Sequence, residues 1–559
     1  MKGSGARTLI VGLDGATWDL ADRFIAEGRM PNLARLVKEG VRAPLNSTSP
    51  PMTLPSWSSM LTGCNPGRHG IFDFVRKVED RWALEFTNAT HRAVPTLMRV
   101  LSDRGLRAGS VAVPTTWPPE SLNGVQVSGF DGPVSTGIDA SFCEPKGVYD
   151  EIKRRFGGMK FADFQESVID EQWHDRALDA LLREIPRKTA IAQWLMESER
   201  YDCFMLLFGE SDTVSHHFWM FHDERSPRHD PTASARLKDA IATVYTALDD
   251  ALGKLIASAG PEHVCVVSDH GFGGASTYAL YLNRFLESKG WLTYKHEVEV
   301  DGMATGSGLA AKLRAVASTR VPADWQGKLY RAVPDAVLGS IQTKSRFGDV
   351  DFDRTQAVSD EMNYAATIRL NLPGASSEQR AEAVSRLEAD LATWEVDGHR
   401  VVKSVSTREE LYSGACVSDS PDVILELNLR DDYSYTLLPS LRVPSGTTWR
   451  RLEPSEYVGG KGLGMNGTHR QFGLLSLWGR GVVAGGSVEA GMPDIAPTLL
   501  HLMGEPVPEH MDGRVISEAI AAHQAPERTA SELTPRRPAS ATESEAQAIR
   551  ERLERLGYL

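Results

Sequence analysis

The chain has 559 residues, of which 41% are apolar and 24% charged, proportions that exclude wholesale disorder and are typical of a folded globular protein. Its formal net charge of −13 argues against a general nucleic-acid binder, which needs a basic surface, but allows a small anionic substrate held by bound cations. No apolar run approaches the roughly 20 residues of a membrane span, and no leader precedes the first apolar run, so we expect a cytoplasmic protein. Its cysteines lack close spacing, which predicts buried thiols: Cys64, Cys143, Cys203, Cys265 and Cys416.

Short apolar runs alternate with amphipathic stretches along the chain. The runs are rich in β-branched and aliphatic residues and predict fully buried parallel strands at 8–13, 109–114, 124–130, 204–209, 263–269 and 473–479. Helices are expected between them, at 30–39, 94–105, 172–198, 233–258 and 493–503. This alternation predicts an α/β fold with a central, mostly parallel sheet.

Several segments interrupt the alternation within a main unit that we place at 1–523. Residues 131–172 are expected to form a lid over the sheet edge, and residues 296–350 an inserted cap. A smaller α+β portion follows at 360–440. The stretch 524–542 is rich in Pro, Ser, Thr and charge and predicts a flexible linker, and 543–559 predicts a C-terminal docking helix.

Acidic residues follow three of the predicted strands. Asp14 comes after the first run, Asp212 after 204–209, and Asp269 with His270 ends the run 263–269. Because ligands of open parallel sheets bind beyond the carboxyl ends of the strands, these side chains are expected at one edge. A single such Asp often only caps a helix, but three together favour a metal site.

Histidines complete the set. His216 stands one helical turn after Asp212, so both would face the same way, whereas the adjacent His217 points about 100° away and is interpreted as a supporting or lid-facing residue. His469 lies in a Gly-rich turn just before the run 473–479. Its value comes from completing a set of carboxylates and imidazoles suited to two divalent metals.

Thr53 is the candidate nucleophile. Pro55 fits the first turn of a helix that ends at Gly63, which would place the threonine hydroxyl just before a helix N-terminus, where an anion is favoured. Metal coordination can activate such a hydroxyl for attack on phosphorus. The alternative, that Thr53 only caps the helix, is equally compatible with this spacing.

At these residues the chain resembles the alkaline phosphatase superfamily, and most closely its type I phosphodiesterase/nucleotide pyrophosphatase branch, including bacterial phosphohydrolases and phosphomutases. The matching segments are GLDG (12–15), TLPSWSSMLTGCNPGRHGIFDF (53–74), SDTVSH (211–216), SDHG (268–271), GTH (467–469) and MPDIAPTLLHLMG (492–504). The resemblance extends from about residue 7 to 520. It implies an alkaline-phosphatase-like three-layer sandwich with inserted cap segments.

The resemblance also implies roles for individual residues. One metal would be held by Asp212, His216 and His469, and a second by Asp14, Asp269 and His270, with Thr53 between them as ligand and nucleophile. The mixed N/O ligand set favours zinc and also suits manganese. His69 fits the family pattern in a supporting role behind the nucleophile.

Two departures from the family pattern concern the substrate. Ser56 stands where relatives carry an Asn that contacts the phosphoryl oxygen, and Trp57 follows it, so both are candidate substrate contacts. Trp57 and Phe74 have the alternatives of stacking on a base or belonging to the core. No arginine corresponds to the one that clamps a phosphate dianion in monoesterases, which favours a diester.

The resulting prediction is a two-metal hydrolase of small phosphate esters, nucleotides among them, that forms a phosphothreonine at Thr53. The alternatives are a phosphomutase or phosphotransferase on the same site, in which an acceptor hydroxyl replaces water, a phosphomonoesterase, and a non-catalytic metal-binding homologue.

Overall fold

A ten-stranded sheet forms the centre of the larger lobe. The computed structural model describes residues 4–78, 82–129, 138–160, 170–296, 346–347, 349–361, 365–458, 465–521 and 525–531. In the described chain the strand order is β21-β2-β20-β9-β1-β8-β5-β6-β7, and β22 pairs with β2 beside β21. These strands are β1 (Gly5–Leu13), β2 (Val41–Asn46), β5 (Ala108–Val113), β6 (Gly124–Ser128), β7 (Cys143–Glu144), β8 (Arg200–Phe208), β9 (His263–Val267), β20 (Phe472–Gly479), β21 (Gly486–Ser487) and β22 (Ala490–Gly491).

The middle of the sheet is parallel. Strands β9, β1, β8, β5 and β6 run in one direction, with Thr8 of β1 opposite Cys203 of β8 and His263 of β9. The prediction of a parallel strand at 473–479 is wrong, because β20 runs antiparallel to both β9 and β2. Strand β20 is buried among other strands like its parallel neighbours, so its composition shows burial but not direction.

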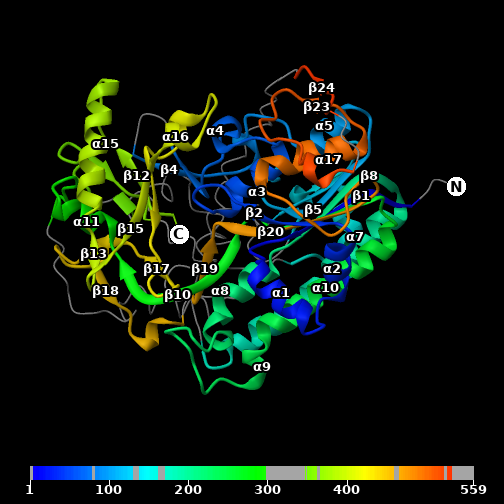
Figure 1. Ribbon diagram of the computed structural model, residues 1–559, viewed down its shortest axis with the longest axis horizontal. Coiled ribbons are helices and arrows are strands. Elements are labelled where there is room, and N and C mark those ends of the chain that lie inside the picture. Colours follow the sequence, from blue (N-terminus) through cyan, green and yellow to red (C-terminus); the bar gives the residue numbers. More distant parts are fainter. Residues whose placement is uncertain are drawn as a thin grey trace.

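Helices cover both faces of the sheet and confirm the three-layer α/β/α sandwich (Figure 1). Along β1, Leu9 and Val11 pack into one core and Ile10 into the other, because successive side chains of a strand point to opposite faces. The first core is closed by α1 (Trp18–Ala26), α2 (Pro31–Glu39), α7 (Trp173–Ser198), α8 (Glu210–His222) and α10 (Ala240–Ala259). The second is closed by α3 (Thr53–Thr62), α5 (Leu97–Asp103) and α17 (Ile495–Met503).

A second lobe, formed by the described residues between 281 and 458, lies beside the sandwich (Figure 1). The strand β10 (Gly271–Leu280) leaves the sandwich and pairs with β17 (Ser434–Leu437), β18 (Trp449–Arg451) and β19 (Gly467–Arg470). Within this lobe, four strands form a sheet in the order β11-β12-β16-β15, accompanied by one long helix. Its elements are β11 (Ala357–Val358), β12 (Thr367–Leu370), α15 (Ser377–Leu391), β15 (Val402–Thr407), α16 (Arg408–Leu411) and β16 (Val423–Leu427).

Shorter elements complete the described chain. They are β3 (Val75–Lys77), β4 (Leu84–Phe86), α4 (Pro66–His69), α6 (Gly147–Phe156), α9 (Ala235–Lys238), α11 (Leu282–Ser288), β13 (Glu395–Val396), β14 (His399–Arg400), β23 (Val507–Pro508) and β24 (Arg528–Thr529). The helix predicted at 233–258 is thus divided into α9 and α10.

The predicted inserts differ from expectation where they are described. In the segment 131–172, β7 adds an antiparallel edge strand to the central sheet and Ile152 of α6 packs into the core, so this part extends the sandwich instead of covering it as a lid. The cap at 296–350 lies almost wholly outside the described residues, as does the C-terminal helix at 543–559. Within the predicted linker, β24 pairs with β23, so residues 528–529 belong to the folded body.

The sequence also predicted buried thiols and no apolar run long enough to span a membrane. All five cysteines are free, and four of them are buried while Cys416 is half-buried. In the described part of the chain, no helix has the length and apolar character needed to cross a bilayer.

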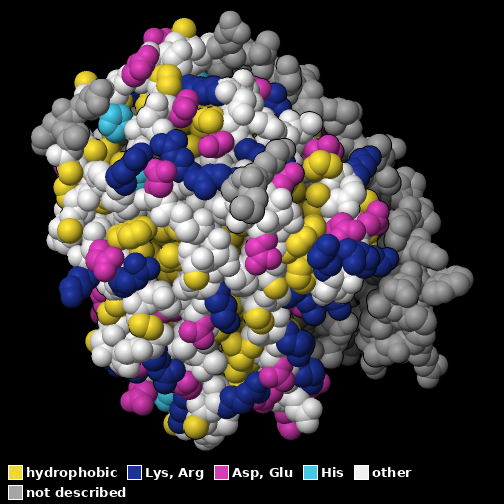
Figure 2. Space-filling view, turned by 90° about the vertical axis from the view of Figure 1, so that its right-hand side faces the viewer, with side chains coloured by type: hydrophobic (Ala, Val, Ile, Leu, Met, Phe, Trp, Pro, Cys, Tyr) yellow, Lys and Arg dark blue, Asp and Glu magenta, His cyan; other side chains and the backbone are white. Residues whose placement is uncertain are grey.

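On the face of the larger lobe turned away from the second lobe, basic and acidic side chains are interspersed (Figure 2).

Candidate functional site

Three adjacent strands deliver acidic side chains to one edge of the sheet. Asp14 follows β1 directly, Asp212 lies in the first turn of α8 after β8, and Asp269 follows β9. The backbone N–H of Asp14 donates to the Phe208 carbonyl at 2.9 Å, which continues the β1–β8 pairing to the last residue. The shared edge places the carboxylates together because these strands are parallel neighbours.

Glycine makes the turn after β1 tight enough for this approach. Gly15 has φ +65°, and a Cβ there would lie 2.9 Å from Phe272 Cδ2. Its N–H donates to Asp269 Oδ1 at 3.1 Å, so the turn holds the neighbouring carboxylate. The GLDG segment therefore positions two acidic residues, one by sequence and one by hydrogen bonding.

The predicted ligands form two buried clusters. The ligand atoms of Asp212, His216 and His469 all lie within 4.8 Å of one another, and so do those of Asp14, Asp269 and His270. His469 reaches the sheet edge because β19 pairs with β10, which places it opposite Phe272. The imidazole rings of His270 and His469 stack with centroids 3.6 Å apart, so the two clusters are immediate neighbours.

Backbone carbonyls fix the tautomer of each histidine. Nδ1 lies 2.8 Å from the Gly467 carbonyl in His216, 2.9 Å from the Pro51 carbonyl in His469, and 3.0 Å from the Gly271 carbonyl in His270. A carbonyl oxygen only accepts, so each Nδ1 carries a proton and Nε2 is the ring nitrogen left to bind a metal; the Nε2 atoms of His216 and His469 lie 3.2 Å apart. This is the usual way in which metal-binding histidines are oriented.

The Nε2 atoms lie close to carboxylate oxygens, at distances that allow both to bind one metal ion. Asp212 Oδ1 is 3.1 Å from His216 Nε2 and 3.5 Å from His469 Nε2. His270 Nε2 is 3.6 Å from Asp14 Oδ1 and 3.3 Å from Asp269 Oδ2. Ligands at about 2.1 Å from a tetrahedral zinc lie about 3.4 Å from each other, so a divalent cation fits each cluster.

The pKa shifts of Asp269 and His270 also favour bound cations at these clusters. Burial and the neighbouring Asp14 charge raise the pKa of Asp269 well above its usual range, and burial together with His469 lowers the pKa of His270 well below its own. Asp269 Oδ2 is buried without a hydrogen-bond partner. A bound cation favours carboxylate anions and neutral imidazoles, so it would offset both costs of burial.

Along the chain, Thr53 lies between two residues that each form a hydrogen bond with one of the clusters. It is buried and is the first residue of α3, one position inside the helix where the sequence predicted a place just before it. Two residues earlier, the Pro51 carbonyl accepts from His469, and four residues later, Trp57 Nε1 donates to Asp14 Oδ2 at 3.0 Å. The segment carrying Thr53 is therefore tied to both clusters.

Ser56 and Trp57, the predicted substrate contacts, are both buried in the protein interior. Trp57 is fully buried, so its ring has no face open to a substrate, and its indole instead orients Asp14. Ser56 is also fully buried, and its hydroxyl lies 2.8 Å from the hydroxyls of both Ser47 and Thr48. The sequence did not indicate these partners, because a helical pattern shows a buried face but not what lies against it.

Histidines outside the clusters have supporting positions. His69 is buried behind α3, where its Nδ1 accepts from the Ile71 N–H and its Nε2 lies 2.9 Å from the Ser59 hydroxyl, as its predicted supporting role requires. Burial and the charge of Arg92 lower the pKa of His69 to about 3. His217 packs edge-on against Trp173 of α7, on the covered side of α8.

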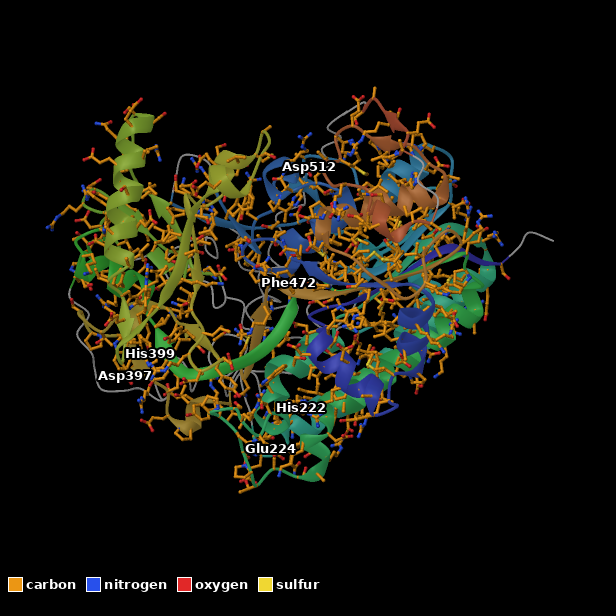
Figure 3. All side chains as sticks on the ribbon, in the orientation of Figure 1. His222, Glu224, Asp397, His399, Phe472 and Asp512 are labelled. Atoms are coloured by element: carbon orange, nitrogen blue, oxygen red, sulfur yellow. The ribbon has the colours of Figure 1, made fainter. Side chains whose placement is uncertain are left out.

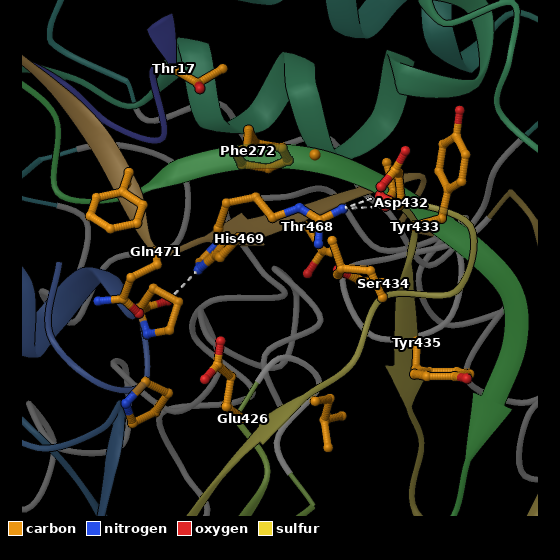
Figure 4. Close-up of a pocket in the computed structure, with 18 of the residues that line it drawn as sticks. Thr17, Phe272, Glu426, Asp432, Tyr433, Ser434, Tyr435, Thr468, His469 and Gln471 are labelled. Carbon is orange, nitrogen blue, oxygen red and sulfur yellow. Dashed lines mark hydrogen bonds between the residues drawn. The ribbon is translucent and has the colours of Figure 1, made fainter. Parts of the chain in front are cut away.

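A cleft of about 1480 Å³ opens beside His469. The larger lobe contributes Thr468, His469 and Gln471, and the second lobe contributes Glu426 and Tyr433 among others (Figure 4). Phe472, with 54% of its surface exposed, lies between the two lobes (Figure 3). Sequence reasoning missed the wall from the second lobe, since its residues carry no motif and reach the site only through long-range packing.

The chain is similar to a known protein family in sequence and to known proteins in structure. Residues 8–436 match the profile of the family described as type I phosphodiesterase/nucleotide pyrophosphatase. No curated protein matches the sequence. Human ectonucleotide pyrophosphatase/phosphodiesterase 5 is similar in structure at 13% identity and a TM-score of 0.46, over 92% of this chain and 100% of that one.

A second similar structure is phosphonoacetate hydrolase from Sinorhizobium meliloti 1021 in complex with phosphonoacetate. It has 14% identity and a TM-score of 0.48, over 90% of this chain and 100% of that one. Because the family profile spans most of the sequence, the chain belongs to the type I phosphodiesterase/nucleotide pyrophosphatase family and is a phosphoric ester hydrolase.

Proposed function

We propose that the chain is a two-metal phosphodiesterase of the nucleotide pyrophosphatase type that works through a phosphothreonine at Thr53. The observation that carries this proposal is the meeting of two ligand clusters beside the N-terminal turn of α3. Membership of the family supports the reaction class, and the N/O ligand set supports zinc, with manganese as the alternative. A small phosphate ester, such as a nucleotide derivative, would enter through the cleft beside His469.

The chain's own residues define the reaction. Thr53 Oγ1 attacks phosphorus in line, the new O–P bond forms as the bond to the leaving alcohol oxygen breaks, and water later cleaves the phosphothreonine to restore the hydroxyl. Divalent cations held by the two clusters would supply charge neutralisation and a lowered pKa for the attacking oxygen. Trp57 keeps Asp14, and the Pro51 carbonyl keeps His469, oriented toward those cations.

Replacement of Thr53 tests this proposal. Thr53→Ala should lower turnover of bis-(p-nitrophenyl) phosphate by roughly a thousandfold or more, because it removes the nucleophile. Thr53→Ser keeps a hydroxyl at the same atom and serves as the matched control, with substantial activity retained. Metal analysis of each variant should still find about two ions per chain. Turnover in the alanine variant equal to that of the wild type would remove Thr53 as the nucleophile.

Substrate preference is measured with the same samples. Because the fully buried residues of α3 provide no cation for a phosphate dianion, we expect faster turnover of bis-(p-nitrophenyl) phosphate than of p-nitrophenyl phosphate. A reversed preference would identify a monoesterase. With labelled water, hydrolysis places the isotope in the released phosphate group, whereas transfer to an acceptor hydroxyl does not.

A further inference from the structure

A second cavity, of about 440 Å³, lies away from the metal clusters. One wall comes from Lys77 of β3 and from Trp82, just before β4, in the larger lobe, and the other from β12, α15 and α16 of the second lobe. Strands β4 and β12 and helix α16 are labelled in Figure 1. Among the described residues, none lines both this cavity and the cleft beside His469. Its charged and aromatic lining residues are Lys77, Trp82, Arg369, Arg380, Arg408 and Asp422.

Among the described residues, the lining carries four cations and one carboxylate. Asp422 Oδ2 accepts from the Leu370 N–H at 2.8 Å, and its Oδ1 lies 3.4 Å from a guanidinium nitrogen of both Arg380 and Arg408. One carboxylate is therefore shared at long range between two guanidinium groups, neither of which forms a close bidentate pair with it. Arg408 has one further carboxylate neighbour, the exposed Glu409 at 2.9 Å.

Arg369 is the most buried of the four. It is 8% exposed, its Nη1 donates to the Asp419 carbonyl at 3.2 Å, and its Nε is buried without a hydrogen-bond partner. The nearest carboxylate oxygen, Asp360 Oδ2, lies 3.6 Å from that Nε. A buried guanidinium with an unused donor is costly unless an acceptor is supplied, and this one lines the cavity.

Lys77 brings positive charge from the opposite wall. Its Nζ lies 5.2 Å from the Trp82 ring centroid, and that ring stacks on Phe352 with centroids 4.5 Å apart. The hairpin is thereby held against the segment before β11. An acceptor in the cavity would meet the ammonium from one lobe and the guanidinium groups from the other.

We propose that this cavity is a second binding site that takes a small phosphate-bearing anion. Guanidinium groups present paired donors that match phosphate oxygens, and a compact ammonium adds a point charge. Because the walls belong to different lobes, the bound anion joins the β3–β4 hairpin to the second lobe. The site depends on neither Thr53 nor the metal clusters, so it stands apart from the proposed reaction.

Calorimetric titration of the metal-loaded protein with inorganic phosphate tests the proposal. The wild type should bind at two classes of site, one at the metal centre and one in this cavity. The variant Arg380→Gln/Arg408→Gln should weaken the cavity class by roughly tenfold or more per lost guanidinium and leave the other class unchanged. The control is Arg386→Gln on α15, the helix that carries Arg380. The guanidinium of Arg386 lies over Trp291, and Arg386 does not line the cavity.

A second variant keeps the test decisive if the double variant is unstable. Lys77→Gln changes the other wall and should also weaken the cavity class, whereas the same isotherm in the wild type, Lys77→Gln and Arg380→Gln/Arg408→Gln would overturn the proposal. A parallel titration with AMP identifies the source of the phosphate group. If the variants weaken AMP binding too, the site accepts a phosphate ester; if they weaken phosphate binding alone, it accepts the inorganic anion.

Discussion

The hydrogen bond from Trp57 to Asp14 gives a sharp prediction about metal affinity. Both side chains are buried, and the indole N–H is 3.0 Å from Asp14 Oδ2. Trp57→Phe removes this donor and keeps an aromatic ring in the same core. A hydrogen bond to a charged group contributes about 1.5–3 kcal/mol, which corresponds to roughly a 10- to 150-fold change in a dissociation constant. We therefore expect metal binding at Asp14, Asp269 and His270 to weaken by that factor.

Trp117→Phe is the matched control. Trp117 is 1% exposed, and its Nε1 has no hydrogen-bond partner, so the same replacement removes ring volume and no hydrogen bond. Metal affinity is measured by competition with a chromophoric chelator, and the stability of the chelated protein by urea unfolding. Both variants should lose stability through the smaller ring, but Trp57→Phe alone should lose metal affinity. Equal metal affinity in the two variants would refute this role of Trp57.

Three further predictions concern stability. Chelation of both metals should lower the melting temperature by roughly a few degrees, since bound ligand stabilises the native state, and an unchanged value would mean that the clusters hold none. Between about pH 6.5 and 3 the unfolded chain binds a proton at His69 that the buried native side chain does not, so the native state loses stability as the pH is lowered through that window. In urea unfolding, His69→Gln should reduce this pH dependence by about 1.4 kcal/mol per pH unit, and an unaltered dependence contradicts the prediction. Lys188→Met should cost about 3–5 kcal/mol by stranding Glu210, its buried partner at 2.9 Å. Lys188→Met/Glu210→Gln should recover most of that loss, and a double variant as unstable as the single one would contradict the stranded-charge explanation.

The sequence was sufficient to predict that Asp14, Asp212 and Asp269 share one edge of the sheet, because that placement follows from parallel strands, whereas the division of ligands between two metals came from the family resemblance. Each of these residues follows a strand within a few positions, and parallel strands bring their carboxyl ends to one edge whatever lies between them in the chain. His216 follows from helical spacing. His469 depended on the family resemblance, since a histidine in a Gly-rich turn does not reveal that β19 pairs with β10.

Other features depend on contacts that no local pattern encodes. The apolar run of β20 shows that the strand is buried, but its direction is set by how the chain returns from β19. The burial of Trp57 was open to prediction, but its choice of Asp14 as acceptor was not, because 43 positions separate them. The cavity around Arg369 joins a hairpin of one lobe to strands of the other, so neither segment alone indicates it.

One strand, β10, connects the two metal-ligand clusters to the second lobe. β10 begins directly after His270, pairs with the strand that carries His469, and continues into the second lobe beside β17. Arg228, 1% exposed, ties these parts together by donating to the carbonyls of Ser276 and Met465 at 2.8 Å and to the Thr436 hydroxyl at 3.0 Å. A buried guanidinium with such contacts resists displacement, because moving any partner leaves its donors unsatisfied. The strand that begins beside His270 therefore pairs with the strand that carries His469 and also with β17, a strand of the cleft-lining second lobe.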